Sequence, residues 1–138
     1  MKRIIFSVFI LYAFSFSIAQ TNDNAKDSSA IYSVNSWIKI IDEGNYEKSW
    51  DVSSELFKRA VTKEQWVKTV STSREPFGKL LIREIKTKKY NTQLPGVPDG
   101  EYYSFEFNSS FEKKKESVET ITAILENGEC KIIGYFIR

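Results

Sequence analysis

The stretch LPGVPDGEYYSFEF, residues 94–107, joins a stiff turn to an aromatic strand. Proline fixes the backbone angle φ and lacks an N–H donor, and glycine accepts turn conformations, so the Pro-Gly part predicts a rigid connection. Side chains alternate between the two faces of a strand, and in the strand predicted for residues 101–111 Tyr103, Phe105 and Phe107 share one face. The stretch therefore predicts a sheet whose aromatic face is covered by other elements.

Strand-like alternation continues on both sides of this segment. Residues 79–90 precede it, residues 118–126 follow it, and residues 129–137 come after Asn127-Gly128, which is a strong hairpin signal. The four segments predict an antiparallel meander. One face is expected to carry Tyr103, Phe105, Phe107, Ile121, Ala123, Leu125, Ile133, Tyr135 and Ile137. The opposite face is expected to carry Tyr102, Val118, Ile124, Ile132 and Phe136.

The residues before position 79 follow a helical period instead. Apolar residues at helical spacing predict a first helix, with Ile31, Val34, Ile38 and Ile41 on its buried stripe and Gly44 at its end. A second helical stretch covers residues 46–60, with a break near Ser53-Ser54. A third begins at Thr62, where Thr62 and Gln65 form a capping-box pattern, and ends around Pro76 and Gly78.

Helices followed by a meander predict one α+β domain over residues 30–138. Three N-terminal helices are expected to pack on one face of a curved, four-stranded antiparallel sheet. The polar residues 20–29 predict a flexible lead before this domain.

The first 19 residues have the pattern of a secretory signal peptide. Lys2 and Arg3 precede an apolar run that ends in small residues, and we expect cleavage after Ala19. The whole chain has 20 basic and 18 acidic residues, and Lys2 and Arg3 would leave with the signal, so the mature chain would carry 18 of each. This balance argues against nucleic-acid binding. The protein is expected to be periplasmic or secreted, with no membrane contact after cleavage.

The composition also restricts the chemistry that is available. The chain contains no histidine, which removes histidine-dependent nucleophile systems and most zinc and iron sites. Cys130 is the only cysteine, so an internal disulfide is excluded, and the residue is expected to serve as a small apolar side chain. We therefore expect no catalytic residues, no metal and no cofactor.

Two charged residues are expected on the helix-covered side of the sheet. By alternation, Arg83 lies with Leu81 and Ile85, and Glu119 lies with Ile121. An isolated charge in apolar surroundings is costly, so Arg83 and Glu119 are expected to pair. The pair is interpreted either as a structural ion pair or as an anion site in which Arg83 is the donor.

Five aromatic residues are candidates for the lining of a cavity beneath the sheet. They carry a polar tip on an apolar body, which suits both ligand pockets and ordinary cores. The candidate pocket consists of Arg83, Glu119, Tyr103, Tyr135, Trp37, Trp50 and Trp66.

Two motifs are specific when they occur together. They are Leu94-Pro95-Gly96-x-Pro98-Asp99-Gly100-Glu101-Tyr102 and the closing Gly134-Tyr135-Phe136-Ile137-Arg138. With Asp42-x-Gly44-x-Tyr46, Ser49-Trp50 and Gln65-Trp66, they make residues 36–138 resemble the bacterial family called domain of unknown function 4019. That family is similar in layout to the nuclear transport factor 2-like cone. The resemblance implies an exported bacterial protein and no assigned activity.

Three functions remain open on the sequence. The first is a non-catalytic module that binds an unknown small molecule or protein, with a homodimer through the outer sheet face as one form. The second is an enzyme of the ketosteroid-isomerase type, with Glu119 as base and tyrosines as donors. The third is a structural or envelope accessory protein that acts by assembly.

Overall fold

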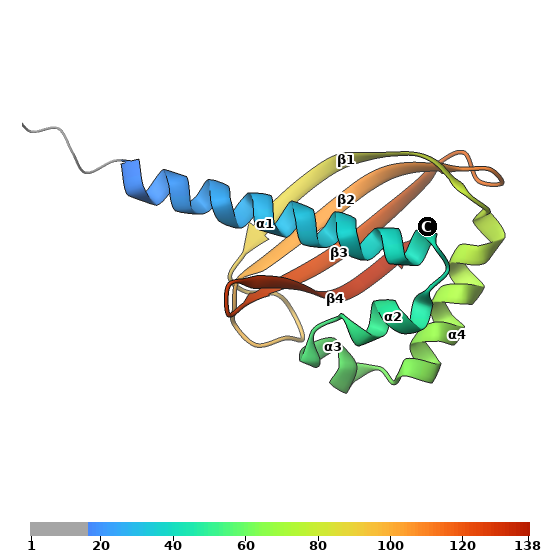
Figure 1. Cartoon of the computed structure of the whole chain (residues 1–138), viewed down its shortest axis with the longest axis horizontal. Coiled ribbons are helices and arrows are strands. Elements are labelled where there is room, and N and C mark those ends of the chain that lie inside the picture. The colour runs from blue at the N-terminus through green and yellow to red at the C-terminus, as the bar shows by residue number, and fades with distance from the viewer. Residues whose placement is uncertain (1–16) are drawn as a thin grey trace, which may run out of the picture.

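The predicted α+β class is confirmed by a computed structural model, which describes residues 17–138 and side chains from residue 23 onward. The strands form an open antiparallel sheet in the order β1-β2-β3-β4. The helices are α1 (Ser17–Asp42), α2 (Tyr46–Asp51), α3 (Glu55–Ala60) and α4 (Lys63–Arg74), followed by the short 3₁₀ turn η1 (Glu75–Phe77). The strands are β1 (Leu80–Asn91), β2 (Tyr102–Phe111), β3 (Ser117–Glu126) and β4 (Glu129–Ile137). Figure 1 shows α1 lying across one face of the sheet.

The first helix is longer than the sequence predicts. Residues 20–29, expected to be a flexible lead, are the N-terminal part of α1. Side chains tie this part to the sheet, since Lys26 contacts Glu101 and Asp27 contacts Lys88. Polar composition alone therefore underestimates the helix, because tertiary contacts add to local propensity. The predicted signal peptide, residues 1–19, lies outside the described residues apart from its last three.

The second predicted helical stretch is two helices, so the described chain has four α-helices where three were predicted. The break falls at the expected place, and Ser54 caps α3 by accepting a hydrogen bond from the N–H of Phe57. The backbone N–H of Ser54 also donates to the carbonyl of Ile132, which fixes α3 against β4. The predicted capping box of Thr62 and Gln65 is confirmed at the start of α4.

The face assignment of β4 needs a correction. Thr122 pairs with Gly134 but Ala123 pairs with Ile132, so Ile133 is an extra residue on β4. Because of this bulge, the side chain of Ile132 points toward the helix-covered core. The sequence had predicted Ile133 at that place.

The turn at residues 94–100 covers one end of the outer sheet face. The hydroxyl of Tyr102 donates to the carbonyl of Pro98, and Tyr102 is fully buried. A Cβ added at Gly100 would lie 3.2 Å from the Tyr102 ring, so the turn packs closely on it. Tyr102 and its cross-strand neighbour Ile124 are therefore not part of an open outer surface, in contrast to the prediction.

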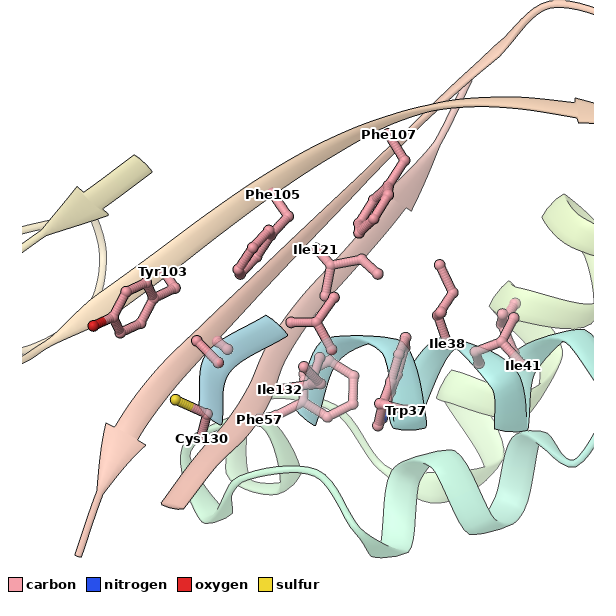
Figure 2. Packing of buried hydrophobic residues seen from close by; sticks show 14 of the residues in the cluster. Trp37, Ile38, Ile41, Phe57, Tyr103, Phe105, Phe107, Ile121, Cys130 and Ile132 are labelled. Carbon is pink, nitrogen blue, oxygen red and sulfur yellow. The ribbon is translucent and has the colours of Figure 1, made fainter. Parts of the chain in front are cut away.

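The core lies between α1 and the sheet. Figure 2 shows Phe105, Phe107 and Ile121 from the sheet meeting Trp37 and other residues of α1. Cys130 is buried at the edge of this cluster, in agreement with the role predicted for it.

Candidate functional site

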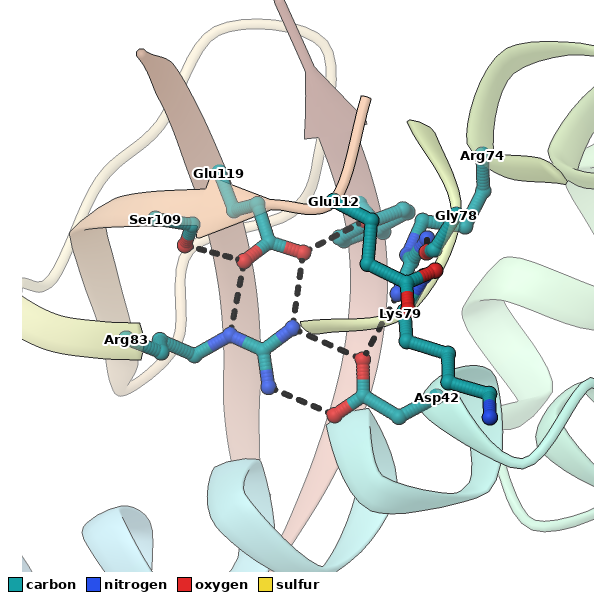
Figure 3. A network of polar contacts seen from close by, with 9 residues as sticks. Asp42, Arg74, Gly78, Lys79, Arg83, Ser109, Glu112 and Glu119 are labelled. Carbon is teal, nitrogen blue, oxygen red and sulfur yellow. Dashed lines mark hydrogen bonds and ion pairs between the residues drawn. The ribbon is translucent and has the colours of Figure 1, made fainter. Parts of the chain in front are cut away.

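The predicted pair of Arg83 and Glu119 is present and forms the centre of a buried polar cluster (Figure 3). Glu119 on β3 is 0% exposed. Its Oε2 accepts from Arg83 Nε at 2.6 Å and from the Ser109 hydroxyl, and its Oε1 accepts from Arg83 Nη2 at 3.1 Å and from the Tyr135 hydroxyl at 2.7 Å. Each carboxylate oxygen therefore has two donors.

Asp42, like Ser109, is a member of this cluster that the sequence reasoning missed. It is the last residue of α1, and its carboxylate accepts from Arg83 Nη1 at 2.6 Å and from Nη2 at 2.9 Å. An acidic residue at a helix C-terminus meets the negative end of the helix dipole and needs a cation nearby. That position, in Asp42-x-Gly44, was the signal that could have identified it.

Arg74 is a second cation that the site interpretation did not include. It ends α4, and its Nη2 donates to Asp42 at 3.2 Å while its Nη1 donates to the carbonyl of Gly78 at 2.7 Å. Its Cζ lies 4.1 Å from the ring centre of Phe111, which is a cation–π contact. Two guanidinium groups and two carboxylates thus share the cluster, so its formal charge is balanced.

The electrostatics favour the charged form of Arg83 and the neutral form of Tyr135. Burial would lower the pKa of Arg83, but its hydrogen bonds to Asp42 and Glu119 outweigh this and raise it. Burial, followed by the negative charge of Glu119, raises the pKa of Tyr135. The phenol therefore keeps its proton and donates a hydrogen bond to the Glu119 carboxylate.

This arrangement limits the chemistry available at Glu119. A general base needs a lone pair within hydrogen-bond reach of the substrate proton. Both oxygens of Glu119 are already occupied by Arg83, Ser109 and Tyr135, and the side chain has no exposed surface. The geometry suits a structural role, in which the hydrogen bonds of the cluster hold α1 against the four strands of the sheet.

Three of the predicted aromatic residues lie together. The ring centres of Trp37 and Tyr135 are 5.6 Å apart, those of Trp37 and Trp66 are 6.1 Å apart, and those of Trp66 and Tyr135 are 6.4 Å apart. Trp37 Nε1 donates to the carbonyl of Ser49, and Trp66 Nε1 donates to the Ser49 hydroxyl. These rings pack against one another, and the two indole N–H groups are satisfied by α2, whereas the Tyr135 hydroxyl donates to Glu119 on β3.

The other two predicted aromatic residues lie elsewhere. Trp50 packs beside α3 and has Lys58 and Lys63 over its ring. Tyr103 lies toward the other end of β2 from Ser109, and its ring centre is 5.2 Å from that of Tyr90. The seven predicted residues are thus divided among the charged cluster, the aromatic cluster and two separate positions.

Tyr103 lines a pocket, although it lies apart from the charged cluster. This pocket has a volume of about 240 Å³ and is lined by Asp23, Lys26, Asp27, Tyr90, Glu101 and Tyr103. A more open groove of about 460 Å³ lies beside Ile82 and Glu84 on β1 and extends to Arg138.

Among residues 17–138 there is no helix long and apolar enough to cross a membrane. The same described part of the chain holds no group of three or more acidic or cysteine side chains placed for a metal ion.

The fold and the cluster define an α+β domain in which helices cover one face of an open antiparallel sheet and a buried ion network joins the two. The chain belongs to the family described as protein of unknown function (DUF4019), which matches residues 33–135. The match confirms the family expected from the sequence motifs, and it includes every residue of the charged cluster. A search of curated proteins found no match.

Proposed function

We propose that this chain is an exported, non-catalytic protein-interaction module that receives an extended segment of a partner protein along β1. The observation that carries the proposal is the exposed apolar part of this edge strand. Leu81, Ile82 and Ile85 are 51%, 60% and 48% exposed. Apolar residues on an open sheet edge favour the addition of another strand.

The two edges of the sheet differ in a way that supports this proposal. At the β4 edge, the carbonyl of Ile132 is occupied by the backbone N–H of Ser54. At the β1 edge, no backbone hydrogen bond beyond the pairing with β2 reaches residues 80–91 from anywhere in residues 17–138. The backbone groups on the outer side of β1 are therefore available to a partner strand.

The charges of β1 describe the partner. Its first half holds the exposed apolar residues together with the partly buried Arg83 and the exposed Glu84, whereas its second half carries Lys86, Lys88 and Lys89. Lys88 is engaged by Asp27, and Lys86 lies 4.0 Å from Glu106. The partner segment is expected to combine an apolar half with an acidic half, and the groove beside Ile82 offers space for one of its side chains.

The same observations weigh on the alternatives. Glu119 supports a non-catalytic role over an isomerase-type enzyme, because no lone pair of its carboxylate is left for a substrate. A purely structural assembly protein would use the same edge with a second copy of itself. The likeness in layout to the nuclear transport factor 2-like cone is part of this proposal, and the helical cover on one face of the sheet supports it.

Site-specific photo-cross-linking tests the β1 edge. With a photoreactive amino acid in place of Ile82, the chain should give one adduct of defined mass in the cell envelope. The matched control carries the same amino acid in place of Phe136, which is equally exposed but lies on β4, and it should not give that adduct. No adduct at position 82, or identical adducts at both positions, would overturn the proposal. An adduct with the mass of two chains would identify the partner as a second copy and favour the assembly role.

Export is tested by the mass of the mature protein. The full chain, expressed in a bacterium that has a periplasm, should be recovered from the periplasmic fraction with the mass of residues 20–138. Replacing Lys2 and Arg3 with glutamate should leave the precursor in the cytoplasm. If the cytoplasmic fraction instead yields a chain that still begins at Met1, export is contradicted. The proposed interaction at β1 is then tested by the cross-linking experiment alone.

A further inference from the structure

The pocket beside Tyr103 lies at the opposite end of β1 from Arg83. Asp23, Lys26 and Asp27 come from α1 and Tyr90 comes from β1. Glu101 directly precedes β2, and Tyr103 lies at the start of that strand. The pocket is independent of the charged cluster and of the exposed apolar half of β1. Its volume of about 240 Å³ lies below the range of about 300–1,000 Å³ that is common for drug-sized ligands, so an occupant would be small.

Tyr103 brings an unused hydrogen-bond donor to this pocket. The residue is 2% exposed, and its hydroxyl has no hydrogen-bond partner among the side chains and backbone groups of the described residues. Figure 2 shows this hydroxyl directed away from the rest of the core cluster. Burial, with the charge of Asp27 as a further cause, raises the pKa of Tyr103 to about 12, so the hydroxyl stays protonated. Its oxygen is not among the fully buried polar atoms that lack a partner in residues 23–138, so it is open to the pocket and can donate to an acceptor on a bound molecule.

The acidic residues of the pocket are only partly neutralised. Glu101 accepts from Lys26 Nζ at 2.7 Å and from the Tyr90 hydroxyl at 3.1 Å. Asp27 is paired with Lys88. Asp23 has no ion-pair partner among residues 23–138. Three carboxylates therefore face two lysines, which leaves a local excess of negative charge beside the free Tyr103 donor.

We propose that this pocket binds a small organic amine that also carries a hydroxyl or carbonyl oxygen. The ammonium group lies against Asp23 and Asp27, and the oxygen accepts the hydrogen bond of Tyr103. The faces of Tyr90 and Tyr103, whose ring centres are 5.2 Å apart, add a cation–π contribution. Amino sugars and amino alcohols have this combination of groups.

Calorimetric titration of the protein, purified after expression of the full chain, tests the site with glucosamine and ethanolamine as probes. At least one of them should bind. N-acetylglucosamine retains the oxygens but lacks the ammonium charge, so its affinity should be lower by about 10-fold or more, as expected for a charge-assisted hydrogen bond.

Two substitutions separate the two halves of the proposed site. Tyr103→Phe retains the ring and should weaken binding by about 3–10-fold, as expected for one neutral hydrogen bond. Asp23→Asn should weaken binding of the charged probes while leaving N-acetylglucosamine unchanged. Tyr32→Phe, on an exposed part of α1, is the matched control and should bind like the unmodified protein. The proposal is overturned if neither amine binds, if the acetylated sugar binds equally well, or if both pocket variants bind normally.

Discussion

Glu119→Gln is expected to lower the free energy of unfolding by about 3–5 kcal/mol, the usual cost of breaking a buried ion pair by removing one partner. All four contacts of the Glu119 carboxylate are with donors, from Arg83, Ser109 and Tyr135. An amide would place its NH₂ group against two of these donors and would leave the Arg83 charge only partly compensated by Asp42. Urea denaturation followed by tryptophan fluorescence measures the loss.

The matched control for this substitution is Glu129→Gln. Glu129 is strongly exposed and lies 3.9 Å from Lys131, a surface pair of the kind that contributes about 0–1 kcal/mol. The denaturation midpoint of this variant should remain close to that of the unmodified protein. An equal midpoint for Glu119→Gln and Glu129→Gln would refute the view that the cluster holds the helices on the sheet.

Trp37→Ala is expected to cost about 3–5 kcal/mol, the range measured for truncation of large aromatic residues in cores. The ring packs against Trp66 and Tyr135, and its Nε1 donates to both the Ser49 carbonyl and the Ser53 hydroxyl. Truncation removes this packing. It also removes the N–H donor on which the buried Ser49 carbonyl and Ser53 hydroxyl rely. Thermal unfolding followed by circular dichroism measures the effect.

The comparison for Trp37 is Tyr32→Ala, on the same helix. Tyr32 is exposed, and a substitution there should change stability by less than about 0.5 kcal/mol. A loss below about 1 kcal/mol for Trp37→Ala would show that the aromatic cluster contributes little to packing. It would favour the other interpretation made from the sequence, in which these rings line a space for a ligand.

Local periodicity was enough to predict the class of fold and part of the charged cluster. The alternation of β2 and β3 placed Phe105, Phe107 and Glu119 on the covered face, and the cost of a buried charge then required Arg83 as partner. These inferences succeed because the period of a strand is a property of neighbouring residues. The family followed from motifs that span most of the described chain.

The remaining features depend on how distant elements meet. The place of Asp42 at the end of a helix indicates that it needs a cation, but that the cation is Arg83 follows only from α1 ending over β1. The bulge at Ile133 changed the face of Ile132, and the following Gly134 was the one local sign of it, since an isolated glycine in a strand often marks a bulge. Tyr102 is buried because the turn folds back over it, which alternation does not reveal.

The charged cluster also makes the two halves of the chain depend on each other. Asp42 and Arg74 belong to the helical half, whereas Arg83, Ser109 and Glu119 belong to the sheet. If the two halves separated, each would keep one ion pair, Asp42 with Arg74 or Arg83 with Glu119. The two hydrogen bonds from Arg83 to Asp42 would be lost, so a half-folded chain is more costly than lost packing alone would make it. The domain should therefore fold and unfold as one cooperative unit, with no stable fragment on either side of Gly78.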